Sequence, residues 1–263
     1  MPDADILHLE PHGVDTYVGS GPQYPWGGLY GGQIIAQALR AATLSLGDDA
    51  KVPHSLRAYF IRPGDHDEPV RYEVDRLRNG RSYSTRRVVA RQAIGAILNL
   101  EASFTAPSGG PSLTRRPMPD VAGPDAGRDD AWTELFERRV LPMELGTGQV
   151  HEWLRFRDDV GADGATAFAF LSDDVPTDAV RCFLTRPGDD MELFDQGHFM
   201  VSLDHTVWFH EPVEAHEWHL HAFSCDRVVG DRALTNGLVY SADGRHVATI
   251  AQEVLVRRRR REA

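Results

Sequence analysis

The stretch GGLYGGQIIAQALRAATLSL, residues 27–46, decides the fold of this chain. It begins with two Gly-Gly pairs, and from position 33 to position 44 it places apolar or small side chains on nearly every face of a helix. A helix that is apolar all round must be enclosed by other parts of the protein. The sequence therefore predicts one buried helix here, which a curved antiparallel sheet would enclose.

Most other segments have the pattern of β-strands. In residues 70–78, for example, Tyr72 and Val74 alternate with charged residues, as in a half-buried strand. SADGR, at residues 241–245, is typical of an Asp-Gly hairpin turn. The predicted strands cover residues 54–61, 70–78, 83–92, 96–104, 151–157, 202–209, 217–228, 234–242 and 246–256. The pattern favours an α+β protein built mainly from antiparallel strands.

One short phrase is written twice in the chain. LRAYFIRPGD at residues 56–65 and LDHTVWFHEP at residues 203–212 align Phe60 with Phe209. The segments that follow each copy, up to the end of each half, also align strand for strand. Identity between the copies is low, so the order of the segments carries the hypothesis that the chain is an internal duplication.

A linker separates the two copies. Residues 106–130 are dense in Pro, Gly, Ser and Asp and have no apolar periodicity. We therefore predict an N-terminal domain at residues 1–105 and a C-terminal domain of the same architecture at residues 131–263. Residues 164–184 contain the second candidate helix, which two aspartates and a proline interrupt.

Composition excludes several classes of protein. The net charge of −11 argues against a protein that binds double-stranded nucleic acid, because such a protein needs a positively charged surface for the phosphates. Two cysteines, Cys182 and Cys225, give neither a disulfide framework nor metal-site spacing. There is no apolar run near the roughly 18 residues that span a bilayer, and the acidic N-terminus is not a secretory signal. We expect a cytoplasmic protein, with the arginine run at residues 257–261 as a solvated tail or a phosphate contact.

These segments, in this order, resemble the acyl-CoA thioesterase II family. The resemblance rests on GGLYGGQIIAQALRAA, HSLRAYFIRPGD and LRNGRSYSTRRVVARQ in the first half, and on LSDD, SLDHTVWFHEP and AQEVLVR in the second. It covers nearly the whole chain except the linker. It implies a double hotdog, in which two antiparallel sheets each wrap round a long buried helix. It also implies hydrolysis of fatty acyl-CoA to free acid and coenzyme A, no metal or organic cofactor, and a homo-oligomer, either a dimer or a tetramer.

The resemblance also implies a catalytic set from the second half. The matching residues are Asp173 in LSDD, Ser202 in SLDH and Gln252 in AQEVLV, which would hold a water against the thioester carbonyl. Serine stands where the best-known members carry threonine, and the hydroxyl is kept. Two questions remain open from the sequence. Asp174 could face the water in place of Asp173, and Asp173 could also cap the helix that follows it.

Other residues are weaker candidates. Asp204 and His205 are neighbours in one strand, so they point to opposite faces and are interpreted as structural. His219 and His221 form an H-x-H pair, but a carboxylate and a distal histidine at useful spacing are missing, which argues against a metal site. The candidate substrate-binding residues are Gly32, Gln33, His54, Arg62, Arg86 and Arg87, with the arginines expected to meet coenzyme A phosphates.

Two alternatives to a hydrolase remain. A hotdog enoyl-CoA hydratase would need an Asp/His pair in one pocket, which Asp204 and His205 cannot supply. A protein that binds acyl-CoA without turnover would share the fold and lack the chemistry. The first half, which has Pro53 and Glu101 where the second has Ser202 and Gln252, is interpreted as a partner without the catalytic set.

Overall fold

The computed structural model of the protein describes residues 6–47 and 50–259. The first half contains β1 (Glu10–Pro11), β2 (Thr16–Gly19), α1 (Gly31–Leu44), β3 (Val52–Phe60), β4 (Val70–Asn79), β5 (Tyr83–Gln92) and β6 (Gly95–Thr105). The second half contains η1 (Pro124–Ala126), β7 (Arg128–Asp129), β8 (Phe136–Val140), β9 (Gln149–Phe156), α2 (Gly164–Leu171), α3 (Pro176–Leu184), α4 (Met191–Gly197), β10 (His198–Ser202), β11 (Asp204–Phe209), β12 (His219–Val229), β13 (Arg232–Ser241) and β14 (His246–Arg258). Every strand pairing is antiparallel, as the sequence predicts.

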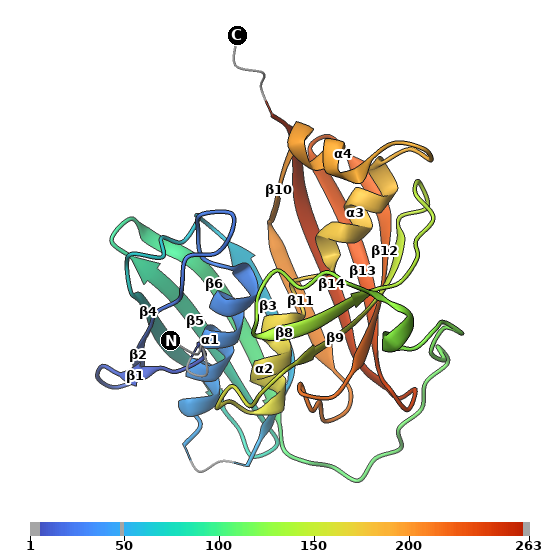
Figure 1. Ribbon diagram of the computed structural model, residues 1–263. Coiled ribbons are helices and arrows are strands. Elements are labelled where there is room, and N and C mark those ends of the chain that lie inside the picture. The colour runs from blue at the N-terminus through green and yellow to red at the C-terminus, as the bar shows by residue number, and fades with distance from the viewer. Residues whose placement is uncertain (1–5, 48–49, 260–263) are drawn as a thin grey trace.

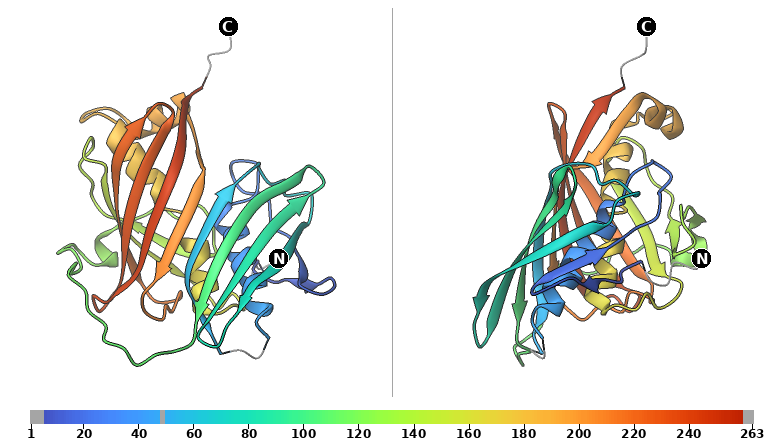
Figure 2. Two further views of the ribbon diagram at one scale, coloured as in Figure 1. Left: turned by 180° about the vertical axis from the view of Figure 1, so that it is seen from behind. Right: turned by 90° about the vertical axis from the view of Figure 1, so that its left-hand side faces the viewer.

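All the strands belong to one sheet. Its order is β1-β2-β4-β5-β6-β3-β11-β14-β13-β12-β9-β8-β7, with β10 paired to β14 beside this path. The prediction of two separate sheets is therefore corrected, because β3 and β11 pair edge to edge and join the halves. The helices lie against one face of the joined sheet, and the view from behind shows the other face (Figure 1; Figure 2).

The join between the halves is made by the repeated phrase itself. In the seam, Leu56 faces Val207 and Arg57 faces Thr206 across β3 and β11. Counted outward from the seam, the strands run β3-β6-β5-β4 on one side and β11-β14-β13-β12 on the other. This mirrored order agrees with an internal duplication. It also means that each half covers the edge strand that the other half would otherwise expose.

The apolar helix α1 is enclosed as expected. Ten of its fourteen residues are buried, and it packs against β3, β4, β5, β6 and α2. Its two buried amides are paired: Gln37 accepts a hydrogen bond from Tyr72, and Gln33 accepts one from Tyr24. None of the described helices, α1 included, is long and apolar enough to cross a membrane.

Among residues 131–259, which the structure describes, there is no single long helix. The predicted helix at residues 164–184 is instead two short ones, α2 and α3, with a break between Leu171 and Pro176. Proline explains the break, because it lacks an N–H to continue the α2 ladder and favours the first turn of a new helix. α2 packs against α1, whereas α3 packs against β9, β12 and β13. The break leaves Asp173 and Asp174 in a tight turn between the two helices.

The predicted linker crosses between the halves along the outside of the molecule (Figure 1). Its last residues hold η1 and β7, and β7 pairs with β8 at the sheet edge. Trp153 donates its indole N–H to the carbonyl of Ala122 at 2.9 Å, and Tyr240 donates its hydroxyl to the carbonyl of Arg116 at 3.2 Å. The segment is therefore tied to the second half despite its composition.

The first turn of α1 lies very close to the end of α2. Tyr30 donates its hydroxyl to the carbonyl of Phe170 at 3.0 Å, and Gly32 lies against that same carbonyl. A Cβ at Gly32 would overlap the Phe170 oxygen and the Tyr30 ring. Only glycine permits this approach, which brings the N-terminus of α1 to the break between α2 and α3.

We predict that Gly32→Ala destabilises the protein by about 1–3 kcal/mol, because the new methyl group must displace a backbone carbonyl rather than a flexible side chain. Thermal unfolding measures the effect. Gly109→Ala is the matched control, since a Cβ at Gly109 meets open space. Equal melting temperatures for the two variants would contradict the close packing of α1 on α2.

Candidate functional site

Three polar side chains from separate elements meet at the N-terminus of α1. Ser202, at the end of β10, donates its hydroxyl to Asp173 Oδ1 at 3.0 Å. Gln252, on β14, donates from Nε2 to Ser202 Oγ at 2.8 Å. Asp173 is 6% exposed and Gln252 is fully buried. The three residues that the family resemblance implied thus form one continuous hydrogen-bonded cluster.

Asp173 also completes the helix of the other half. In the described chain, Tyr30 at the N-cap of α1 makes no capping side-chain hydrogen bond, and the first turn has no acidic residue. The carboxylate of Asp173 lies beside the backbone of Gly31 and Gly32 instead, where the N–H of Gly32 favours its negative charge. The alternative role for Asp173, as a cap of the helix that follows it, is wrong: the N-cap of α3 is Val175. Asp173 caps α1 from a distance in sequence.

Burial changes the acidity of this carboxyl group. Loss of solvent is the main reason that the pKa of Asp173 rises from 3.8 to about 7, and the nearby charge of Asp174 contributes to this rise. Hydrogen bonds from Ser202, Gln252 and Gly32 oppose this shift because they stabilise the carboxylate. A carboxyl group with a pKa near neutrality can both accept and release a proton at physiological pH.

The second aspartate of the pair faces elsewhere. Asp174 Oδ1 accepts the indole N–H of Trp132, and its other oxygen lies 3.4 Å from the guanidinium of Arg138. Arg138 also pairs with Glu152 and Asp178, and all of these groups are buried. Of the two aspartates, Asp173 and not Asp174 contacts Ser202.

A one-residue irregularity brings Ser202 into the cluster. Ser202 pairs with Val254 across β10 and β14, whereas Thr206 pairs with Ala251 across β11 and β14, so one extra residue lies between them. Residues three apart in a regular strand face opposite sides of the sheet. The extra residue acts as a bulge, and it lets Ser202 and His205 both reach Gln252.

His205 is the member of the site that the sequence interpretation undervalued. It is fully buried, and its Nδ1 contacts Gln252 Oε1 while its Nε2 lies 2.8 Å from Ser172 Oγ. Burial lowers its pKa to about 4, so the ring is neutral at physiological pH. The expectation that Asp204 and His205 face opposite sides is confirmed, because Asp204 pairs with the exposed Arg57. What the sequence could not show is that His205 faces inward toward Gln252.

Aromatic side chains cover the side of the site next to Asp174. Tyr24, Trp26, Tyr30 and Trp132 stack or meet edge to face, with ring centroids 5.0–5.8 Å apart. Three of them come from the segment that precedes α1. The signal in the sequence was the aromatic cluster in PQYPWGGLY, residues 22–30, from which no prediction was made.

The candidate substrate-binding residues in the first half are scattered. Gln33 is buried, accepts from Tyr24 and donates to the carbonyl of Ser20, so it holds the chain that precedes α1. His54 lies 2.8 Å from Ser103 Oγ on the neighbouring strand, and burial lowers its pKa. Only Gly32, among the six candidates, contacts the cluster around Asp173.

The three candidate arginines are engaged within the protein. Arg62 is exposed and donates to the carbonyl of Ala96 at 2.7 Å, and Arg87 pairs with Asp75 on the sheet surface. Arg86 is 2% exposed and donates to Ser45 Oγ at 2.7 Å. A guanidinium buried in this way presents no surface to a phosphate in solvent. Within the arginine run, positions 260 and 261 lie outside the described residues.

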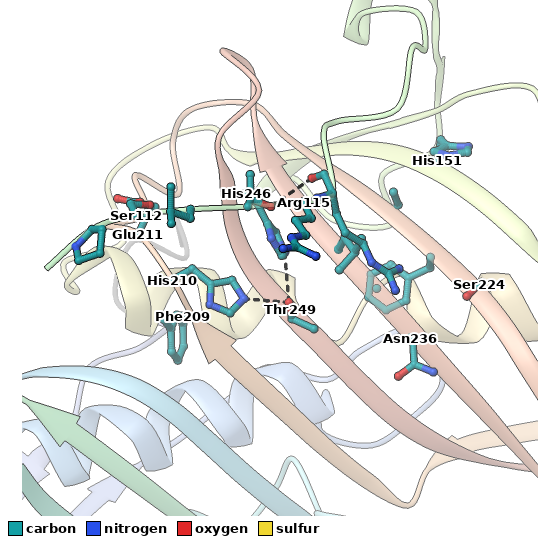
Figure 3. A pocket seen from close by; sticks show the side chains of 18 of the residues that line it. Ser112, Arg115, His151, Phe209, His210, Glu211, Ser224, Asn236, His246 and Thr249 are labelled. Atoms are coloured by element: carbon teal, nitrogen blue, oxygen red, sulfur yellow. Dashed lines mark hydrogen bonds between the residues drawn. The ribbon is translucent and has the colours of Figure 1, made fainter.

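A large groove lies away from the cluster. It has a volume of about 1190 Å³ and lies between the linker and β9, β12, β13 and β14 (Figure 3). On its floor Thr249 contacts both His210 and His246. Thr249 and Gln252 are three residues apart in β14, so they face opposite sides of the sheet. The groove is therefore separate from the buried cluster.

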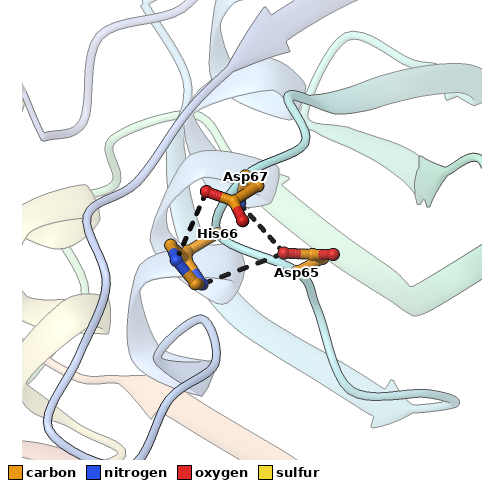
Figure 4. A group of neighbouring side chains, drawn as sticks. All are labelled: Asp65, His66 and Asp67. Carbon is orange, nitrogen blue, oxygen red and sulfur yellow. Dashed lines mark hydrogen bonds and ion pairs between the residues drawn. The ribbon is translucent and has the colours of Figure 1, made fainter.

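A small group of possible metal ligands lies on the loop after β3. Asp65, His66 and Asp67 offer ligand atoms within 4.8 Å of one another (Figure 4). The two carboxylates are exposed by 57% and 84%, and Asp65 accepts the backbone N–H of Asp67. Adjacent residues in a tight loop account for this arrangement without an ion.

The buried cluster has the chemistry of a water-holding site. A carboxylate, a hydroxyl and a primary amide lie in hydrogen-bonding sequence, and together they can orient a water molecule and accept its proton. The positive end of the α1 dipole lies beside them and favours negative charge there. This arrangement suits hydrolysis of an electrophilic carbonyl.

Two protein-family models together match most of the chain. Residues 21–106 match an acyl-CoA thioesterase N-terminal domain, and residues 113–256 match an acyl-CoA thioesterase C-terminal domain. The second match begins within the predicted linker and ends just before the C-terminus of β14.

Individual relatives agree over nearly the whole length. The chain is 31% identical to acyl-CoA thioesterase 2 of Haemophilus influenzae, covering 87% of each protein, and 31% identical to human acyl-coenzyme A thioesterase 8, covering 96% of this chain and 88% of the human protein. The crystal structure of acyl-CoA thioesterase II TesB2 from Mycobacterium marinum superposes with a TM-score of 0.84 at 31% identity, covering 98% of both chains. A hot dog fold protein from Alicyclobacillus acidocaldarius, 22% identical with a TM-score of 0.82, shares the fold. The protein described here belongs to the acyl-CoA thioesterase II family.

Proposed function

We propose that this acyl-CoA thioesterase hydrolyses fatty acyl-CoA to a free fatty acid and coenzyme A by direct attack of a positioned water. The observation that carries the proposal is the unbroken hydrogen-bonded chain from Gln252 through Ser202 to Asp173, next to the N-terminus of α1. The relatives are thioesterases by name, and the chemistry of the cluster fits that reaction without a covalent intermediate.

Each residue has a distinct role in this proposal. Asp173 accepts a proton from the water as its oxygen attacks the thioester carbonyl carbon. Ser202 and Gln252 fix the position of that water, because each can donate and accept a hydrogen bond. The carbon–sulfur bond then breaks, and the coenzyme A sulfur leaves as a thiolate and takes up the proton that Asp173 accepted, which returns Asp173 to its ionised form. The dipole of α1 stabilises the negative charge that develops on the carbonyl oxygen.

The first half has a supporting role in this proposal. At the positions aligned with Ser202 and Gln252 it holds Pro53 and Glu101, which cannot repeat the water-holding arrangement. It contributes α1, whose N-terminus borders the site, and the strand that completes the sheet. We propose that residues 1–105 and 131–263 form the two domains, and that the protein assembles as a homodimer or a homotetramer.

Asp173→Asn should lower kcat about 10²- to 10⁴-fold with little change in KM, because the amide keeps the shape of the carboxylate and cannot accept the water proton. Release of free thiol from acyl-CoA substrates of several chain lengths measures the loss. Asp67→Asn, on an exposed loop, is the matched control and should retain full activity.

The same assay separates the alternatives. A protein that only binds acyl-CoA would release no thiol even before substitution. A hydratase would consume the double bond of an enoyl-CoA without releasing thiol. Either result for the native protein would overturn the hydrolase proposal.

The activity should depend on pH through Asp173. Because burial raises its pKa to about 7, the carboxylate form that accepts a proton is lost as the pH falls through that value. We therefore expect kcat/KM to rise with pH and level off above neutrality, with an inflection near pH 7. A profile that stays flat from pH 5 to pH 8 would argue against Asp173 as the proton acceptor.

Asp173 should also make stability depend on pH. Its pKa is higher in the folded chain than its usual 3.8, so its stabilising contribution is complete below about pH 4 and is lost as the pH rises through about 7. Asn at this position does not titrate. The melting temperature of Asp173→Asn, relative to that of the native protein, should therefore be higher at pH 8 than at pH 5. A constant difference between the two pH values would mean that the pKa is not raised.

A further inference from the structure

We propose that His205 is a positioning residue that fixes the orientation of the Gln252 side-chain amide, so that its NH₂ group faces Ser202 and Asp173. The inference rests on the proposed function, because it explains how the water-holding chain is given a direction. It concerns a residue that lies behind Gln252 and touches neither water nor substrate in that proposal.

The contacts of His205 form a closed path around the site. Its Nδ1 contacts Gln252 Oε1, and its Nε2 lies 2.8 Å from the hydroxyl of Ser172. Ser172 is the residue before Asp173, at the C-cap of α2. The path therefore runs from Asp173 through Ser202, Gln252 and His205 back to the neighbour of Asp173. Every one of these side chains except Ser202 is less than 9% exposed.

Because the His205 ring is neutral, it fixes which group donates and which accepts in each hydrogen bond of this path. A neutral imidazole has one N–H donor and one bare nitrogen acceptor. If Nδ1 carries the hydrogen, it donates to Gln252 Oε1, and the NH₂ group of Gln252 must face Ser202. The hydroxyl of Ser202 is then free to donate to Asp173, as the structure shows. Ser172 Oγ lies 2.8 Å from Nε2 and 2.9 Å from the carbonyl of Ala169, and it has a single hydroxyl hydrogen. In this form the bare Nε2 takes that hydrogen, and the Ala169 carbonyl gives it up.

The opposite tautomer would reverse the path. With the hydrogen on Nε2, Nδ1 would accept from the Gln252 NH₂ group, and the Gln252 oxygen would turn toward Ser202. The single hydrogen of Ser202 would then go to Gln252, and the buried Asp173 carboxylate would lose that donor. Loss of a hydrogen bond to a buried charge is costly, so ionised Asp173 favours the Nδ1–H form. The groups that face the ring are Gln252, Ser172 and Asp173, whose Oδ1 lies 3.9 Å from Nδ1.

Three substitutions test which ring nitrogen matters. Asn places its NH₂ group where His205 has Nδ1, Gln places its NH₂ group nearer the position of Nε2, and Leu has no donor. We expect His205→Asn to keep kcat within about threefold of the native value, and His205→Gln and His205→Leu to lower kcat about 10- to 100-fold, the range for residues that orient a functional side chain. KM should change little in all three, because substrate binding does not involve His205.

The outcomes separate this inference from the proposed function. If the native protein releases no thiol, the proposed function fails and the kinetic comparison does not apply. If the native protein is active and all three variants lose kcat equally, or none does, the positioning role of Nδ1 is overturned. Melting temperatures identify any variant whose loss of kcat comes from unfolding. The comparison of His205→Asn with His205→Gln is the decisive one, because both variants bury one amide and differ mainly in where its NH₂ group lies.

A second measurement needs no activity. Long-range ¹H–¹⁵N correlation spectra of the native protein at pH 8.5, where Asp173 is ionised, distinguish a protonated imidazole nitrogen from a bare one, and His205→Asn identifies the resonances of His205. We expect a protonated Nδ1 and a bare Nε2. A protonated Nε2 with a bare Nδ1 would overturn the inference, whatever the kinetics show.

Discussion

The site depends on one contact between the halves: the Asp173 carboxylate of the second half lies beside the backbone N–H of Gly32 at the start of α1 in the first. α1 is buried and has no acidic residue in its first turn, so it needs a partner for its unpaired N–H groups. That partner is Asp173, which lies in the interruption between α2 and α3, just before Pro176. One carboxylate thus caps a helix, joins two halves and stands at the centre of the site.

Duplication explains why such a site lies between halves. The repeated phrase pairs with itself across β3 and β11, so the sheet is continuous and its strand order is mirrored about the seam. Two copies placed in this way bring the N-terminus of one helix to the break in its counterpart. Only one copy needs a complete set of polar side chains, which leaves the first half free to carry Pro53 and Glu101.

Two buried polar networks with different purposes lie side by side. Asp173 belongs to a chain of neutral donors, Ser202, Gln252 and His205, and its pKa is raised to about 7. Asp174 belongs to an ionic network around Arg138, in which burial raises the pKa of Glu152 to about 8. Burial raises the carboxyl pKa in both networks, and what differs is the partner: Asp174 lies against the Arg138 guanidinium, whereas Asp173 has neutral hydrogen-bond donors. The direction in which each aspartate points therefore decides its chemistry.

Local pattern in the sequence was enough to determine the buried helix and nearly all the long strands, and it indicated the duplicated order. The family resemblance pointed to Asp173, Ser202 and Gln252, which the structure brings together. These features can be read from the spacing of apolar residues or from short motifs. Burial on one face of a strand, or all round a helix, directly restricts which residue types occur at those positions. Only the tertiary structure decided that the strands of both halves form a single sheet and that the second helix is divided into α2 and α3. It also decided that Arg86 is buried and that Ser202 and His205 share a face of the sheet. These features depend on pairing between segments far apart in the chain. A single extra residue between Ser202 and Thr206 reverses which side chains face inward, and no local pattern records it.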